Sequence, residues 1–171
     1  QETNHAPGNP LMNQNDIRNT LDTESIRLSK ALGQNLLHDQ NVLQRIAKAA
    51  DLQKDDNVLE IGPGLGSLTE HLLQKVNELT VIEKDKRLAS HLGEKFKNTT
   101  NFKLIHNDAL KYFENIEVDW GPWKMVSNLP YNVASPLLVD LAAMPRGPQR
   151  LVITVQWEVG QRLNAKPSTR E

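Results

Sequence analysis

The sequence lacks several features on which whole classes of protein depend. None of its 171 residues is cysteine, which excludes disulfide-stabilised folds, thiolate zinc sites and cysteine nucleophiles. No hydrophobic run approaches the roughly 18 residues that a membrane span needs, and no charged-then-apolar signal sequence opens the chain. Lys and Arg (20) nearly balance Asp and Glu (21), so the net charge of −1 neither requires nor excludes a nucleic-acid partner. We therefore expect a cytoplasmic protein with no membrane partner.

Common catalytic signatures are also missing. The five histidines are scattered, and none forms the i, i+4 pair of a helical zinc site, so we expect no metal. No GxSxG elbow is present, which leaves a serine hydrolase unsupported. No Gly-Lys-Ser/Thr follows the glycine-rich turn, which excludes a nucleoside-triphosphate loop.

Short apolar segments alternate with amphipathic ones from residue 40 onward. This alternation predicts an α/β fold with a mostly parallel, doubly wound sheet covered by helices on both faces. Asp39 is the expected N-cap of the helix that precedes the first strand, and Pro136 is expected in the first turn of the helix that it enters. The other elements are expected as strands at 57–61, 78–83, 102–106, 123–127 and 151–156, and as helices at 67–76, 85–96, 135–143 and 158–165.

The chain divides into a tail and one domain. Residues 1–20 hold only four apolar side chains, too few to offset the entropy of ordering the segment. We therefore expect a flexible tail over 1–24 and a ligand-binding domain over 25–171.

A glycine-rich turn follows the first expected strand. Its sequence at 62–66, GPGLG, allows the backbone to approach a ligand, and the helix start after it offers free N–H groups. Glu83 follows Gly62 by 21 residues, where a carboxylate can accept both hydroxyls of a ribose. A tight strand–helix turn would use the same glycines. Because Ser67 and Leu68 stand where a third nicotinamide-type glycine would fall, an adenosine-bearing cofactor without a long pyrophosphate fits best, and S-adenosylmethionine is the leading candidate.

Asn107 and Asp108 follow the third expected strand. A carboxylate there lies beside the crevice of the sheet and is placed to accept from an adenine amino group. Asp108 would also serve as the N-cap of a helix starting at Ala109, and the two roles are compatible.

The tetrapeptide Asn128-Leu129-Pro130-Tyr131 follows the fourth expected strand at its carboxyl end. The lone pair of a purine amino group is delocalised, which makes it a poor nucleophile. Oxygen atoms of an Asn side chain and of a nearby main-chain carbonyl can accept its two hydrogens and favour a tetrahedral nitrogen. Tyr131 offers a face for the base, worth about 1–3 kcal/mol. The alternative is an ordinary turn before a helix.

These motifs resemble the catalytic domain of the KsgA-type ribosomal RNA adenine dimethyltransferases. The resemblance runs from about Leu28 to Lys166 and implies a Rossmann-like class I methyltransferase fold that uses S-adenosylmethionine. It implies dimethylation of two adjacent adenosines near the 3′ end of small-subunit rRNA, with the immature small ribosomal subunit as partner. Its most specific stretches are 32–37, 60–69, 81–85, 107–110, 126–136 and 155–163.

The resemblance also implies a role for individual residues. Asn128 and the carbonyl of Leu129 orient the target nitrogen, Pro130 stiffens the motif, and Tyr131 stacks on the base. The reaction is direct displacement of the sulfonium methyl, assisted by positioning rather than by a strong base. The cofactor is bound by Gln34, Asn35 and Leu37 at its methionine end, by Gly62 and Gly64 along the loop, by Glu83 at the ribose, by Lys84 and Asp108 at the adenine, and by Asn128 beside the methyl group.

Two features depart from the family pattern. Leu36 stands where the family usually has Phe, and Trp157 where a charged residue is common. The chain also ends before the antiparallel sixth and seventh strands and the small helical domain, so we expect an incomplete sheet that stops after its fifth strand. We expect a monomer, unless the exposed edge at 151–156 pairs with another chain or the C-terminal helix covers it.

Three other hypotheses compete with this one. The first is the related enzyme that methylates large-subunit rRNA and confers antibiotic resistance, although Leu129 and the run at 133–136 resemble the small-subunit type more closely. The second is a non-catalytic RNA-binding assembly factor that keeps the fold. The third is a nicotinamide dehydrogenase, which the GxGxG spacing disfavours.

Overall fold

The computed structural model describes residues 40–114, 118–129 and 131–154, without the side chains of residues 40, 131 and 132. The expected tail, the Asp39 cap and the helix at 158–165 lie outside these residues. The elements are α2 (Gln40–Ala49), β1 (Asn57–Ile61), α3 (Ser67–Leu73), β2 (Glu78–Glu83), α4 (Lys86–Lys95), β3 (Phe102–His106), α5 (Ala109–Glu114), β4 (Trp123–Asn128), α6 (Tyr131–Ala143) and β5 (Arg150–Thr154).

The five strands form one parallel sheet in the order β3-β2-β1-β4-β5. The chain builds outward from β1 to β3 and then returns to the other side of β1 to add β4 and β5. This reversal places a topological switch point between β1 and β4, where open α/β sheets bind their ligands beyond the carboxyl ends of the strands. The predicted fold class is confirmed.

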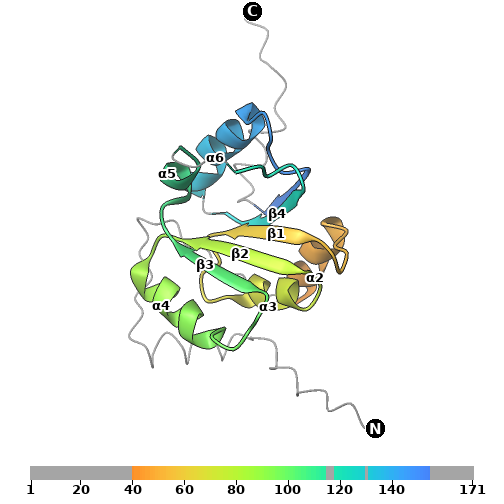
Figure 1. Ribbon diagram of the computed structural model, residues 1–171, viewed down its shortest axis with the longest axis vertical. Coiled ribbons are helices and arrows are strands. Elements are labelled where there is room, and N and C mark those ends of the chain that lie inside the picture. Colours follow the sequence, from red (N-terminus) through yellow and green to blue (C-terminus); the bar gives the residue numbers. More distant parts are fainter. Residues whose placement is uncertain (1–39, 115–117, 130, 155–171) are drawn as a thin grey trace, which may run out of the picture.

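Helices cover both faces of the sheet, as Figure 1 shows: α2, α3 and α4 lie on one face, and α5 and α6 on the other. Successive side chains of β1 belong to two different hydrophobic cores, one on each face of the sheet. Val58 packs with Leu43 of α2 and Leu72 of α3, whereas Leu59 packs with Leu137 of α6. Strands buried on both faces become continuous apolar runs, which is why β1 and β2 could be recognised in the sequence.

α4 begins one residue after its predicted start, because Asp85 is its N-cap and not its first residue. The side chain of Asp85 accepts hydrogen bonds from the backbone N–H groups of Arg87 (2.8 Å) and Leu88 (3.4 Å). These bonds satisfy two of the donors that a helix leaves free at its first turn. The Arg87 guanidinium, 2.8 Å from Asp85 Oδ2, lowers the pKa of this carboxyl and keeps it ionised as a cap.

The prediction for α6 was wrong at its start. The helix begins at Tyr131 rather than at residue 135, so Pro136 lies inside it and not in its first turn. Proline has no N–H, and residue 132 therefore loses its i+4 donor. The apolar face of the helix, which buries Ala134, Leu137 and Leu141 against the sheet, stabilises the helix despite this lost bond.

Within the described residues, no helix is long and apolar enough to cross a membrane. β5 has one neighbour there, β4, and Leu151 on β5 is partly exposed. Within the described residues β5 is therefore an edge strand, as expected. Whether later residues pair with it or cover it lies outside the described part.

Replacing Gly66 with Ala should destabilise the fold by about 1–3 kcal/mol. Gly66 has a φ of 85°, and a Cβ built on it would lie 2.9 Å from Leu92 Cδ2 and 3.0 Å from Phe96 Cε2. Gly93→Ala is the matched control, because its Cβ would meet only Leu104 Cδ2 at 3.6 Å within a helix. We expect it to be neutral or slightly stabilising. Urea unfolding measures both, and equal effects would contradict the argument.

Candidate functional site

The carboxyl ends of β1 and β4 are joined by a side chain instead of continuous backbone pairing. Paired positions between these strands run from Asn57–Trp123 to Leu59–Met125, whereas β1 stays paired with β2 as far as Ile61. The Ile61 N–H instead donates to the buried Ser127 hydroxyl, at 2.8 Å. The two strands can therefore separate at the switch point without leaving this buried N–H unsatisfied.

The glycine turn leaves β1 at this point. Gly62, Gly64 and Gly66 all have left-handed φ values (65°, 61° and 85°), a conformation that glycine adopts without strain. The Gly62 N–H donates to the Ile82 carbonyl at 2.9 Å, and the Gly66 N–H donates to the Pro63 carbonyl at 3.0 Å. The turn is thus fixed to β2 and closed on itself, and it presents Gly62 and Gly64 half-exposed at the edge of the sheet.

Glu83 ends β2 beside this turn. Its side chain accepts the Asp85 N–H at 2.7 Å and also receives a hydrogen bond from the Gly64 backbone. The residue is only 5% exposed, and burial raises the pKa of Glu83, although these hydrogen bonds oppose the rise. The predicted loop and the predicted ribose-binding acid are therefore in direct contact.

Lys84 and Asp108 form an ion pair at the ends of β2 and β3. Lys84 Nζ lies 2.7 Å from Asp108 Oδ2, and this bond lowers the pKa of Asp108. Asp108 Oδ1 accepts the Leu110 N–H at 3.1 Å, which confirms the expected helix-cap role. The structure thus brings together two residues that the sequence placed at the adenine separately.

Asn128 ends β4 and lies next to β5. Its Oδ1 accepts a hydrogen bond from the Thr154 hydroxyl at 2.6 Å, and the Leu129 N–H donates to the Thr154 carbonyl at 3.1 Å. Leu129 is fully buried. Thr154, which sequence reasoning did not single out, therefore contacts the Asn128 oxygen assigned to the target nitrogen and also accepts the backbone N–H of Leu129.

Some predicted site residues cannot be placed. Gln34, Asn35, Leu37 and Pro130 lie outside the described residues. Tyr131 begins α6, but its side chain is not described. Their roles remain predictions.

Glu60 is a buried acid that precedes the glycine turn. Its Oε2 accepts a hydrogen bond from Thr69 Oγ1 at 2.7 Å, and the residue is 1% exposed. Burial, with a smaller contribution from the nearby Glu83 charge, raises the pKa of Glu60 to about 8. Glu60 is therefore mainly protonated at neutral pH, and it stands behind the turn as a neutral hydrogen-bonding group. Sequence reasoning included it in the motif but gave it no role.

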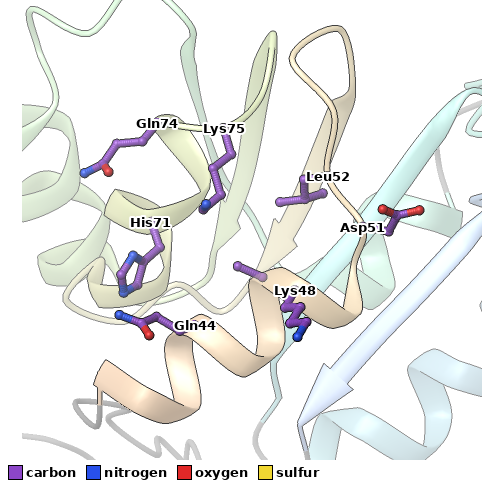
Figure 2. Close-up of a pocket in the computed structure, with 8 residues that line it drawn as sticks. Gln44, Lys48, Asp51, Leu52, His71, Gln74 and Lys75 are labelled. Atoms are coloured by element: carbon purple, nitrogen blue, oxygen red, sulfur yellow. The ribbon is translucent and has the colours of Figure 1, made fainter.

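The described residues contain no cluster of His, Asp and Glu that could hold a metal ion. They do contain a pocket of about 610 Å³ between α2 and α3, shown in Figure 2. His71, Gln74 and Lys75 line it at the end of α3, which starts at the carboxyl edge of the sheet and runs back toward the amino edge. The pocket contains none of the predicted site residues and is separate from the switch point.

The site has the parts that an adenosine cofactor with a cationic sulfur needs. A glycine turn allows close approach of the backbone, a buried carboxylate lies beside it, and a second carboxylate stands one strand further along the sheet. Neutral and anionic oxygen acceptors lie along the carboxyl edge of the sheet from β4 to β3, and such acceptors suit hydroxyl and amino groups.

Comparison with known proteins agrees with this geometry. Residues 26–171 match the family model for ribosomal RNA adenine dimethylase. The chain belongs to this family. Ribosomal RNA small subunit methyltransferase A from Clostridium acetobutylicum is 43% identical over 161 residues, which cover 94% of this chain and 58% of that protein. The protein of the same name from Dehalococcoides mccartyi is 43% identical over 143 residues, which cover 83% of this chain and 49% of that protein.

Two solved structures are similar to the chain in both sequence and fold. A dimethyladenosine transferase from Plasmodium falciparum superposes with a TM-score of 0.66 at 28% identity, over 77% of this chain and 47% of that one. The 23S rRNA methyltransferase ErmE superposes with a TM-score of 0.64 at 30% identity, over 74% of this chain and 50% of that one. The fold is thus the Rossmann-like methyltransferase fold, and the cofactor of the family is S-adenosylmethionine. The chain spans about half the length of these relatives.

Replacing Glu60 with Gln should change how stability depends on pH. Burial holds the folded-state pKa near 8, above the ordinary value of 4.5, so the stability that the proton confers is complete below about pH 4.5 and is lost as the pH rises through 8. Gln cannot titrate. Relative to the wild type, Glu60→Gln should therefore become more stable across this window, by at most about 1.4 kcal/mol per pH unit.

Chemical unfolding at a series of pH values measures this difference. Glu94→Gln is the control, because it makes the same substitution at a side chain that is 73% exposed. A constant difference between Glu60→Gln and the wild type at all pH values would show that Glu60 is ionised in the folded protein.

Proposed function

We propose that this domain transfers methyl groups from S-adenosylmethionine to the exocyclic amino nitrogen of two adjacent adenosines near the 3′ end of small-subunit rRNA. The immature small ribosomal subunit is then the partner and the cytoplasm the compartment. Residues 25–171 are proposed to form the cofactor-binding domain. The 43% identity to a small-subunit enzyme supports this assignment.

The observation that carries the proposal is that a glycine turn, two carboxylates and the Asn128–Leu129 segment lie at the carboxyl ends of four neighbouring strands, on both sides of the switch point. The contact of Glu83 with Gly64 links the ribose-binding acid to the turn. Asn128 ends β4, the strand on the other side of β1. A cofactor spread along the ends of β1, β2 and β3 would therefore have its reactive end toward β4.

On the cofactor side, the polar residues of the chain supply hydrogen-bond donors and acceptors for the polar groups of the cofactor. Glu83 is proposed to accept the ribose hydroxyls, and Asp108 the adenine amino group, while Lys84 covers the adenine edge and holds Asp108 ionised through their 2.7 Å ion pair. Gly62 and Gly64 are proposed to line the bound molecule. Gln34, Asn35 and Leu37 are proposed to hold its methionine end, as the family resemblance implies.

On the substrate side, the chain positions a weak nucleophile. When bound, S-adenosylmethionine supplies an electrophilic methyl group on a positively charged sulfur. Asn128 Oδ1 is proposed to accept one hydrogen of the target amino group, and the Leu129 carbonyl the other. An amide oxygen has two lone pairs, so Asn128 can accept from Thr154 and from the target at once. Pro130 and Tyr131 complete the motif, with Tyr131 proposed to stack on the base.

The choice of the small subunit over the large subunit rests on sequence. ErmE, a 23S rRNA methyltransferase, is 30% identical, whereas the small-subunit enzymes reach 43%. A large-subunit substrate is therefore the second candidate, and the assays below distinguish the two.

Replacing Glu83 with Gln should weaken binding of S-adenosylhomocysteine by about 1–3 kcal/mol. Gln keeps the size of the side chain but loses the charge and one of the two acceptors that face the ribose. Isothermal titration calorimetry measures the affinity, with Glu94→Gln as a matched control on the exposed face of α4. Unchanged affinity in Glu83→Gln would contradict the assignment of this residue.

Replacing Asn128 with Ala should abolish methyl transfer while leaving the affinity for S-adenosylhomocysteine within about threefold, because the amide acts on the target nitrogen and S-adenosylhomocysteine lacks the methyl group beside which Asn128 is proposed to lie. Transfer of labelled methyl groups is measured to small ribosomal subunits that lack the modification, with unmodified large-subunit RNA as the second acceptor. Preferential labelling of the large-subunit RNA by the wild type would favour the alternative function.

A further inference from the structure

A largely buried lysine of α4 donates a hydrogen bond to the glycine turn. Lys95, the last residue of α4, places its Nζ 3.2 Å from the Leu65 carbonyl oxygen and 2.7 Å from Glu70 Oε1 on α3. One ammonium group therefore joins α4, α3 and the turn between Gly64 and Gly66. Neither Lys95 nor Glu70 has a role in the methyl transfer described above.

The contact fixes one particular peptide group. The Leu65 carbonyl and the Gly66 N–H belong to the same peptide unit, and that N–H donates to the Pro63 carbonyl at 3.0 Å. Both ends of the peptide are thus bonded, one within the turn and one to Lys95. A peptide next to glycine can otherwise rotate readily, because glycine adopts both left- and right-handed φ values.

The ion pair is more suited to fixing geometry than to adding stability. The side chains of Lys95 and Glu70 are only 13% and 9% exposed, and Lys95 Nζ lies 5.3 Å from the centre of the Phe96 ring. Burying two charges costs desolvation energy that their attraction only roughly offsets. A bond that adds little net stability but orients a backbone carbonyl acts mainly on the shape of the turn.

We propose that Lys95 is a positioning residue for cofactor binding. By holding the Leu65–Gly66 peptide, it keeps the turn at 62–66 in the form that accepts S-adenosylmethionine. Without this contact the turn samples other conformations, and the apparent affinity falls in proportion to the fraction that remains competent. The inference rests on the proposed function, which assigns the turn to this cofactor.

The chain provides a matched control at another place in the fold. Lys124 Nζ lies 2.7 Å from Asp56 Oδ2 and 2.8 Å from the Asp51 carbonyl, and the side chains of Lys124 and Asp56 are 11% and 13% exposed. This lysine makes the same pair of contacts with the same burial. It lies near the start of β4, however, away from the turn.

The experiment compares Lys95→Met with Lys124→Met in this chain. Calorimetric titration with S-adenosylhomocysteine gives the affinity, and thermal unfolding gives the stability. We expect both variants to lose similar stability, but only Lys95→Met to lose affinity, by about tenfold. Lys95→Arg, which keeps a buried cation with donors, should restore affinity to within about threefold. The backbone amide signals of Gly62, Gly64 and Gly66 in nitrogen-15 NMR should shift or broaden in Lys95→Met only.

Each outcome decides the question. If the wild type fails to bind, the proposed cofactor site is wrong, which is a different failure from that of the lysine. If Lys95→Met binds as the wild type does, or if both Met variants lose affinity equally, the positioning role is overturned. Should Lys95→Met not fold, Glu70→Gln replaces it, because it keeps the shape but removes the counter-charge that fixes Lys95. We then expect a smaller loss of affinity, and wild-type affinity in Glu70→Gln would overturn the proposal.

Discussion

The reversal of strand order at β1 is the constraint on which the site depends. The chain leaves β1 through α3 on one face of the sheet and leaves β4 through α6 on the other, so neither of these two helices covers the ends of both strands. The bond from the Ile61 N–H to the Ser127 hydroxyl allows the strands to separate there without an unsatisfied backbone group. The other features of the site are arranged around that opening.

Two acidic side chains near the opening, Glu60 and Glu83, are buried. Burial raises the pKa of both carboxyl groups, and it raises the pKa of Glu60 to about 8. Apolar residues at these positions would avoid the desolvation cost. Buried acceptors that are already hydrogen-bonded do not need to reorganise when a ligand arrives, so the cost to stability serves pre-organisation of the site.

Much of the fold followed from the sequence because its inner strands, β1, β2 and β4, are buried on both faces. β1, β2 and β3 were predicted with their observed bounds: β1 and β2 are short, mainly apolar runs, and β3 is an edge strand in which Lys103 and His106 are exposed. The start of α6 was missed, because Pro136 is a strong local signal for a helix start and the packing of Leu137 and Leu141 overrides it. In the candidate site, Glu83 and Asp108 were proposed as cofactor ligands from their places at the ends of two strands, whereas Ser127, Thr154 and Lys95 belong to no local motif.

The sequence by itself determined the order of the elements, the glycine turn and the acids that follow β2 and β3, because these depend on residues close together in the chain. Only the tertiary structure decided which distant groups meet. It paired Lys84 with Asp108, set Thr154 against Asn128, and placed Lys95 behind Leu65. Such contacts arise when the strands align in one register and the helices cross above them, and no spacing within a single segment encodes that alignment.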